Sequence, residues 1–128
     1  MYWTDAEIED LHGKVLTNIE KQGDRKLMFL IKGGETFEMF HKDDCCETVK
    51  VEDICGDLED LLHSPILLAE KVSGKLEKPL HATDESYTWT FYKLATLKGF
   101  VTIRWYGESN GHYSEKVDFV KQNRECGE

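Results

Sequence analysis

Residues 26–41, KLMFLIKGGETFEMFH, form two runs in which apolar side chains alternate with others, joined by Gly33 and Gly34. A period of two is typical of a strand that buries one face. A two-residue Gly-Gly link between two such runs is a strong hairpin signal. We therefore expect an antiparallel hairpin formed by strands 26–32 and 35–41.

The alternation continues on both sides of this hairpin. Residues 15–22 (VLTNIEKQ) and 47–52 (ETVKVE) are expected strands. Before them, Thr4 with Glu7 three residues later has the spacing of a capping box, and Gly13 follows as a stop signal. We expect a short helix there, and a second one near 57–63 that ends before Ser64-Pro65.

The second half of the chain has the same order of segments. We expect strands at 66–73 (ILLAEKVS), 87–95 (YTWTFYKLA), 99–106 (GFVTIRWY) and 114–120 (SEKVDFV). The pattern predicts an α+β fold that is mostly antiparallel β, with about eight strands as two four-stranded meanders plus two short helices. One domain over 1–128 is the expected organisation at this length. An internal duplication would relate residues 14–54 to 65–120, although alternating strands also resemble one another without common descent.

Composition restricts the setting of the protein. No apolar run approaches the ~18–20 residues that span a bilayer, and the acidic, amphipathic N-terminus does not resemble a signal peptide. We expect a cytoplasmic protein with no membrane contact. Its four cysteines include the adjacent Cys45 and Cys46, and we interpret them as free thiols in a reducing compartment.

Charge is unevenly distributed along the sequence. Residues 1–64 contain 16 acidic and 7 basic side chains, whereas residues 65–128 contain 9 of each, which accounts for the net charge of −9. An acidic surface repels phosphate, so direct nucleic-acid binding is disfavoured. A basic protein partner, a cation and simple solubility remain as explanations.

The segment 41–61, HKDDCCETVKVEDICGDLEDL, holds most of the reactive groups. Its weak candidates for metal ligands are His41, Cys45, Cys46 and Cys55. Adjacent strand residues point to opposite faces, so Cys45 and Cys46 cannot easily share a zinc ion. Cys55 precedes the expected helix, which favours a thiolate, but the carboxylates around it oppose one and no paired histidine is identifiable. We expect no metal, no cofactor and no catalytic residue.

The carboxylates of this segment lack the alternating spacing of a calcium loop. Presentation of an acidic face to a basic partner is the specific function that they favour, against ordinary solvation. The predicted partner-binding residues are Asp43, Asp44, Glu52, Asp53, Asp57, Glu59 and Asp60.

Aromatic residues favour a different kind of site in the second half. An exposed group of Tyr92, Arg104, Tyr106 and Tyr113 has the composition of an interface hot spot. It could also stack on a nucleobase while Arg104 holds a phosphate. The alternative is that these side chains only stabilise the sheet through cross-strand pairs.

The phrases DCCE and EDICGDLEDL within residues 41–67, and TIRWYGESNG within residues 87–119, are long enough to be specific. Together with LHGKVLTNIE they make the chain, from about Leu11 to Phe119, resemble a small domain-of-unknown-function family of bacteriophage and bacterial proteins. His12 and His63 stand where this resemblance implies smaller residues. The resemblance implies a setting, a phage protein inside a bacterium, and brings no activity or site residues.

We therefore expect a non-enzymatic protein that engages or inhibits a host protein with a basic surface through its acidic face. A first alternative is a sponge for a nucleotide-like signal that binds at Tyr92, Arg104, Tyr106 and Tyr113, with a pocket between two subunits of a homo-oligomer. A second alternative is a metal- or thiol-dependent enzyme.

Overall fold

The computed structural model of the chain describes residues 2–123. Over this range it contains nine strands and two 3-10 helices. In chain order they are β1 (Tyr2–Asp5), η1 (Ile8–Leu11), β2 (Leu16–Gln22), β3 (Lys26–Ile31), β4 (Thr36–Phe40), β5 (Thr48–Cys55), η2 (Leu58–Leu61), β6 (Leu68–Gly74), β7 (Ser86–Thr96), β8 (Gly99–Ser109) and β9 (Asp118–Asn123).

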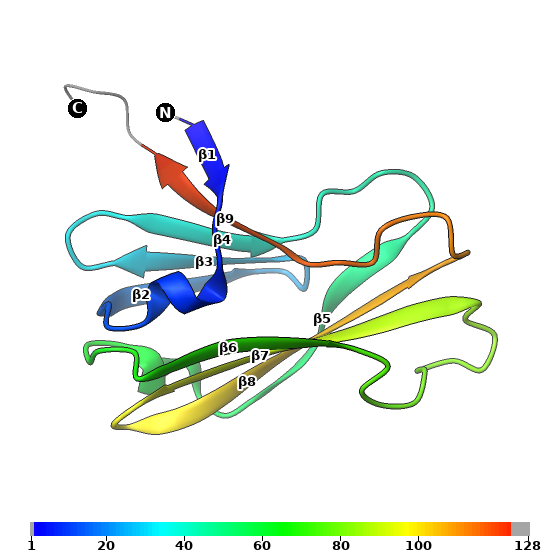
Figure 1. Cartoon of the computed structure of the whole chain (residues 1–128). Helices are drawn as coiled ribbons and strands as arrows, with labels where there is room; N and C mark the ends of the chain where they lie inside the picture. Colours follow the sequence, from blue (N-terminus) through cyan, green and yellow to red (C-terminus); the bar gives the residue numbers. More distant parts are fainter. Residues whose placement is uncertain (1, 124–128) are drawn as a thin grey trace.

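The strands form two sheets that face each other, as Figure 1 shows. The five-stranded sheet has the order β1-β9-β4-β3-β2, and the four-stranded sheet has the order β5-β8-β7-β6. All of the pairs between named strands are antiparallel. The expectation of a mostly antiparallel β protein is confirmed.

One hydrophobic core fills the space between the sheets. Phe29, Phe37 and Met39 contribute to it from the five-stranded sheet, and Ile103 and Trp105 from the four-stranded sheet. Within each strand these residues are two positions apart, so the alternation in the sequence corresponds to the buried face. Among the described residues, no helix has the length and the apolar character to cross a membrane.

The predicted hairpin around Gly33-Gly34 is present as β3 and β4. Its turn is closed by hydrogen bonds from Ile31 N–H to the Glu35 carbonyl, at 2.9 Å, and from Gly34 N–H to the Ile31 carbonyl, at 3.0 Å. Both glycines have φ values above 100°, a region that residues with a Cβ rarely adopt. The hairpin turn therefore depends on glycine at both positions.

The two four-stranded meanders are wrong, because the fourth strand of each half crosses to the opposite sheet. β5 leaves β4 and pairs with β8, whereas β9 leaves β8 and pairs with β4. Tight turns keep β2, β3 and β4 adjacent, but the longer loop over residues 41–47 lets the chain change sheets. The five-stranded sheet thus contains four strands of the first half and β9, and the four-stranded sheet contains three strands of the second half and β5. The duplication itself stays a prediction.

The two predicted helices are also wrong. Thr4 lies in β1, a strand that the sequence did not indicate, and each predicted helix is replaced by a single 3-10 turn, η1 or η2. Soon after each turn the chain returns to β pairing, through the bridges from Val15 to Pro65 and from Leu16 to Leu62. One turn is too short for a stable α-helix, because nucleation is costly and only propagation compensates for it.

Candidate functional site

β5 is an edge strand of the four-stranded sheet and positions the predicted acidic residues. A register shift between Val51 and Asp53 makes Glu52 a bulged residue, and both Glu52 and Asp53 are exposed. The remaining members of the set lie just before β5, in the loop over residues 41–47, or just after it, around η2. We call the whole set the acidic edge: Asp43, Asp44, Glu52, Asp53, Asp57, Glu59 and Asp60. All of these residues except the half-buried Asp60 are exposed.

Some carboxylates of the acidic edge have partners within the protein. Asp53 lies 3.3 Å from the Arg104 guanidinium, and Asp57 accepts a hydrogen bond of 3.0 Å from the backbone of Glu59 at the start of η2. The middle of β5 is also held by the five-stranded sheet, because Val51 N–H donates to the Asp24 carbonyl at 2.7 Å. The bulge and this cover block the addition of another strand at that point, so the edge presents side chains rather than open backbone.

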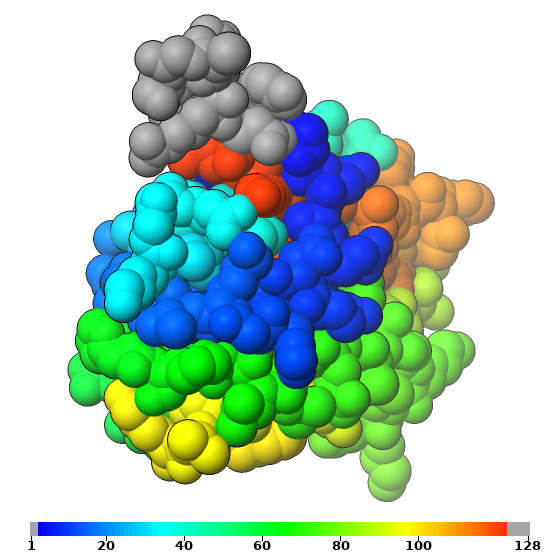
Figure 2. Space-filling model, turned by 60° about the vertical axis from the view of Figure 1, so that its left-hand side comes forward, coloured from blue at the N-terminus to red at the C-terminus, as the bar shows by residue number. Residues whose placement is uncertain are grey.

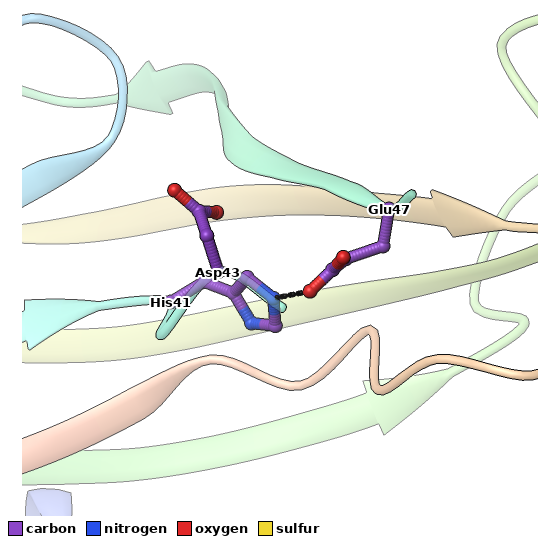
Figure 3. Close-up of side chains that lie close together, drawn as sticks. All are labelled: His41, Asp43 and Glu47. Carbon is purple, nitrogen blue, oxygen red and sulfur yellow. Dashed lines mark hydrogen bonds and ion pairs between the residues drawn. The ribbon is translucent and has the colours of Figure 1, made fainter. Parts of the chain in front are cut away.

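Beneath the exposed loop over residues 41–47 lies a buried ion pair between His41 and Glu47, shown in Figure 3. The two side chains are 3% and 1% exposed, and His41 Nε2 lies 2.7 Å from Glu47 Oε2. The other ring nitrogen of His41 contacts the segment that precedes β9: His41 Nδ1 lies 2.7 Å from the Lys116 carbonyl oxygen. The pair thus connects the loop that precedes β5 to the segment that precedes β9.

The hydrogen bonds around Glu47 stabilise the charged form of its carboxylate. The Glu47 carboxylate accepts hydrogen bonds from the backbone N–H groups of Asp44, at 2.9 Å, and of Cys45, at 3.0 Å. The hydrogen bond from His41, followed by these backbone N–H groups, lowers the pKa of Glu47 to about 2 against the opposing effect of burial. Both ring nitrogens of His41 face oxygen atoms, Nδ1 the Lys116 carbonyl and Nε2 the Glu47 carboxylate.

His41, Asp43 and Glu47 form the one group of three metal-capable side chains among residues 2–123, with ligand atoms within 4.8 Å of one another. Figure 3 shows Asp43 pointing away from the hydrogen bond that joins the other two. With both imidazole nitrogens engaged, a metal ion would have to displace either the Glu47 or the Lys116 contact. The geometry therefore favours a structural role for the His41–Glu47 pair, which fixes the loop, rather than a metal site.

The cysteines do not join this group as metal ligands. Cys45 and Cys46 are joined by a disulfide between adjacent residues, which corrects the expectation that they are free thiols. Cys55 is a free, exposed thiol at the end of β5, and Cys126 lies outside the described residues. Of the four weak metal candidates, only His41 lies in the group just described.

The predicted aromatic site does not form one surface. Tyr92 faces the core and is 1% exposed, because it shares a face of β7 with Leu94. Arg104 and Tyr106 lie on the outer face of the four-stranded sheet, opposite Phe91 and Trp89 respectively. Tyr113 lies in the loop between β8 and β9. The structure therefore brings together only Arg104 and Tyr106.

The loop over residues 75–85 covers much of that outer face. Trp89 Nε1–H donates to the Lys78 carbonyl at 3.1 Å, and the Tyr106 hydroxyl both accepts from Leu80 N–H at 3.2 Å and donates to Asp84 at 2.5 Å. Burial, followed by the hydrogen bond to Asp84, raises the pKa of Tyr106. These aromatic side chains are therefore a second, smaller core under a loop rather than an exposed hot spot.

Arg104 contacts two aromatic rings and two carboxylates on the same face. Its guanidinium carbon lies 5.1 Å from the ring centres of both Trp89 and Phe91, a cation–π geometry. Its nitrogens also contact Asp53 at 3.3 Å and Glu77 at 3.0 Å. A guanidinium that already has two carboxylate partners is poorly placed to hold a phosphate.

Glu47 is the residue of this region that the sequence analysis missed. It stands two positions before Val49 and four before Val51, and both valines are buried. His41 likewise stands two positions after the buried Met39. A histidine and a glutamate at core-facing positions on the two sides of one loop were the available signal for a buried pair.

The resemblance noted in the sequence is confirmed at the level of the family. No curated protein and no solved structure matches the chain. A family model described as "Domain of unknown function (DUF7448)" matches residues 9–119, which is most of the chain. The chain therefore belongs to this domain-of-unknown-function family.

Proposed function

We propose that this chain is a non-enzymatic binding protein that engages, and thereby inhibits, a host protein with a basic surface in the bacterial cytosol. The acidic edge is the proposed interface. The observation that carries the proposal is that seven carboxylates lie on one edge strand and on the segments at both of its ends. Carboxylates along one edge strand are suited to electrostatic complementarity with a basic partner.

Two further properties support this interface. The net charge of −9 comes from the half of the sequence that contains the acidic edge, so long-range attraction would orient a basic partner toward it. In addition, the bulge at Glu52 and the Asp24 cover prevent an unspecific strand-to-strand association along the middle of β5. The edge is thus suited to contacts between side chains.

The test compares two charge-reversal variants of equal net charge. The edge variant carries Glu52→Lys and Glu59→Lys, and the matched control carries Glu20→Lys and Glu85→Lys. All four residues are exposed, and each double reversal changes the net charge from −9 to −5. Asp53 and Asp57 are left intact because they contact Arg104 and η2.

Immobilised wild type and both variants are incubated with bacterial lysate, and the retained proteins are quantified by mass spectrometry at two salt concentrations. We expect a basic protein that the wild type and the control retain, that the edge variant loses, and whose retention falls with salt. Equal retention by the two variants would contradict the acidic edge as the interface.

A second candidate function, small-ligand binding, is favoured by a hollow beside Tyr106. This hollow of about 350 Å³ lies between β5, β8 and the loop over residues 75–85. Its walls include the carboxylates of Glu52, Asp84 and Glu108, which favour a neutral or cationic ligand over a nucleotide phosphate. Native mass spectrometry of gently purified protein tests it, since a bound ligand adds mass to the chain and a bare chain contradicts tight binding.

A further inference from the structure

A second cleft, of about 180 Å³, lies where the two sheets meet beside the start of β9. The five-stranded sheet contributes residues of β1, η1 and β9, and the four-stranded sheet contributes Lys71 of β6 and Tyr92 of β7. Figure 2 shows the N-terminal segment, in blue, lying against β6, in green, along this boundary. We call this space the Tyr92 cleft. Its polar lining residues are Asp5, Glu7, Lys71, Tyr92, Lys116 and Asp118.

Tyr92 is the feature of this cleft that lacks an explanation. Its side chain is 1% exposed, and its hydroxyl is buried without a hydrogen-bond partner among the described residues. Nearly all buried polar groups in folded proteins have a partner, and an unsatisfied one costs ~1–3 kcal/mol. Tyr92 lines the cleft, but its hydroxyl oxygen has almost no accessible surface, so a partner in the cleft reaches it only when the lining side chains move apart.

The charges around the hydroxyl group indicate the sign of that partner. Asp118 is 22% exposed and is held by Lys42 N–H at 2.9 Å, while the Lys116 ammonium, 3.6 Å from it, belongs to a side chain that is 73% exposed. Burial, followed by the negative charges of Asp118, Glu7 and Glu9, raises the pKa of the Tyr92 hydroxyl. The lining thus contains three carboxylates, Asp5, Glu7 and Asp118, against two ammonium groups, Lys71 and Lys116, both on exposed residues.

The size of the cleft sets a second limit. Its volume is well above the ~10–15 Å³ that one water molecule requires. A group of several heavy atoms fits, and its N–H groups could donate to both the hydroxyl oxygen of Tyr92 and the Asp118 carboxylate. The excess of carboxylates in the lining makes a cation the more favourable occupant.

We propose that the Tyr92 cleft binds one organic cation of the alkylammonium or guanidinium class, held by the Tyr92 hydroxyl and the Asp118 carboxylate. Such a group occurs in free small molecules and at the end of lysine and arginine side chains of a partner. None of the residues that line the cleft belongs to the acidic edge. This site is therefore independent of the proposed interface, and either one can fail without the other.

The experiment is an NMR titration of the full chain with two probes, agmatine and a neutral peptide that contains a single arginine. We expect agmatine to shift the resonances of residues 5–7, 71, 92 and 116–119 in a saturable way. Saturation by agmatine identifies free-cation binding, whereas saturation by the peptide alone identifies a partner's side chain. Both outcomes support the proposal, and the absence of shifts at the cleft with either probe overturns it.

Two matched variants separate a site from general electrostatic attraction. Tyr92→Phe removes only the hydroxyl group, and Tyr87→Phe does the same for a half-buried tyrosine elsewhere on β7. Tyr92→Phe is expected to weaken binding of the effective probe at least about tenfold, the loss of a hydrogen bond to a charged group, while Tyr87→Phe leaves it unchanged. Equal affinity in both variants overturns the proposal.

The free protein gives a control on the premise. Because the Tyr92 hydroxyl has no hydrogen-bond partner within residues 2–123, Tyr92→Phe should not lower the free energy of unfolding in the absence of probe. A clear loss of stability would mean that a permanently bound water molecule already satisfies the hydroxyl group, and the proposal would then be abandoned.

Discussion

Replacing His41 by alanine would remove the imidazole that links Glu47 to the Lys116 carbonyl. Two hydrogen bonds of 2.7 Å disappear, and the Glu47 carboxylate remains beneath the loop with only the backbone N–H groups of Asp44 and Cys45. Two segments that are far apart in sequence, the loop before β5 and the approach to β9, lose this connection. The substitution therefore tests whether the pair holds the two strands that exchange sheets.

The expected loss is large. The imidazole is 3% exposed, and breaking a buried pair by removal of one partner typically costs ~3–5 kcal/mol, since the remaining charge is uncompensated. His12 is exposed and forms no comparable side-chain contact with the rest of residues 2–123. His12→Ala is therefore the matched control and should stay within ~0.5 kcal/mol of the wild type.

The pH dependence gives a second readout with a defined sign. The pKa of Glu47 falls from 4.5 to about 2 on folding, mainly because of His41. A lowered carboxyl pKa stabilises the fold fully above the unfolded pKa, and this contribution is lost as the pH falls from about 4.5 through about 2. His41→Ala removes the main cause, so the difference between variant and wild type should shrink over that interval.

Urea unfolding followed by circular dichroism, repeated between neutral and acidic pH, measures both effects. Similar m-values would show that the comparison concerns stability rather than a change in the unfolded state. If His41→Ala unfolded within ~1 kcal/mol of the wild type at neutral pH, with an unchanged acid limb, the structural role of the pair would be refuted.

Two other substitutions test the packing around the acidic edge and the covered sheet face. Gly56→Ala should lower the free energy of unfolding by ~1–3 kcal/mol or more, because Gly56 has φ +110° and a Cβ would lie 2.5 Å from the Phe100 carbonyl oxygen. Gly23→Ala, at φ +64° with no atom near the added Cβ, is the control. Equal urea midpoints of the two variants would contradict the clash. Arg104→Ala removes the 3.0 Å contact to Glu77 and should accelerate tryptic cleavage after Lys75 with the fold retained, whereas the exposed Arg25→Ala should not. Identical cleavage rates after Lys75 would show that Arg104 does not hold the loop.

The strands were predictable where the chain buries one face. In β3 the residues Leu27, Phe29 and Ile31 are buried while those between them are half-buried, and this alternation is visible in the sequence. The β3–β4 turn was equally predictable, because a Gly-Gly link supplies the positive φ values that a tight turn between two strands needs. Strand partners are a different matter. Alternation in β5 is compatible with β4 or β8 as a neighbour, so the exchange between sheets left no local signal.

The predicted side-chain orientation was wrong where a strand is covered on both faces. In β7, Trp89, Thr90 and Tyr92 are each at most 2% exposed, because the core covers one face and the loop over residues 75–85 covers the other. Alternation then no longer distinguishes inside from outside, and Tyr92 was assigned to the surface. The exposure of the acidic edge was better predicted, since its members are close in sequence and carry charges that stay at a surface. Its role in partner binding stays a prediction.

The exchange of β5 and β9 has a consequence for how the protein is made. A ribosome releases the N-terminal half first, but β4 gains its neighbour β9 only when residues 118–123 have emerged. Until then β4 presents an unpaired edge, and β5 waits for β8, which is synthesised some fifty residues later. Folding that depends on such distant pairings is slow, and open strand edges are prone to aggregate. The nascent chain is therefore expected to depend on chaperones until its last strand is complete.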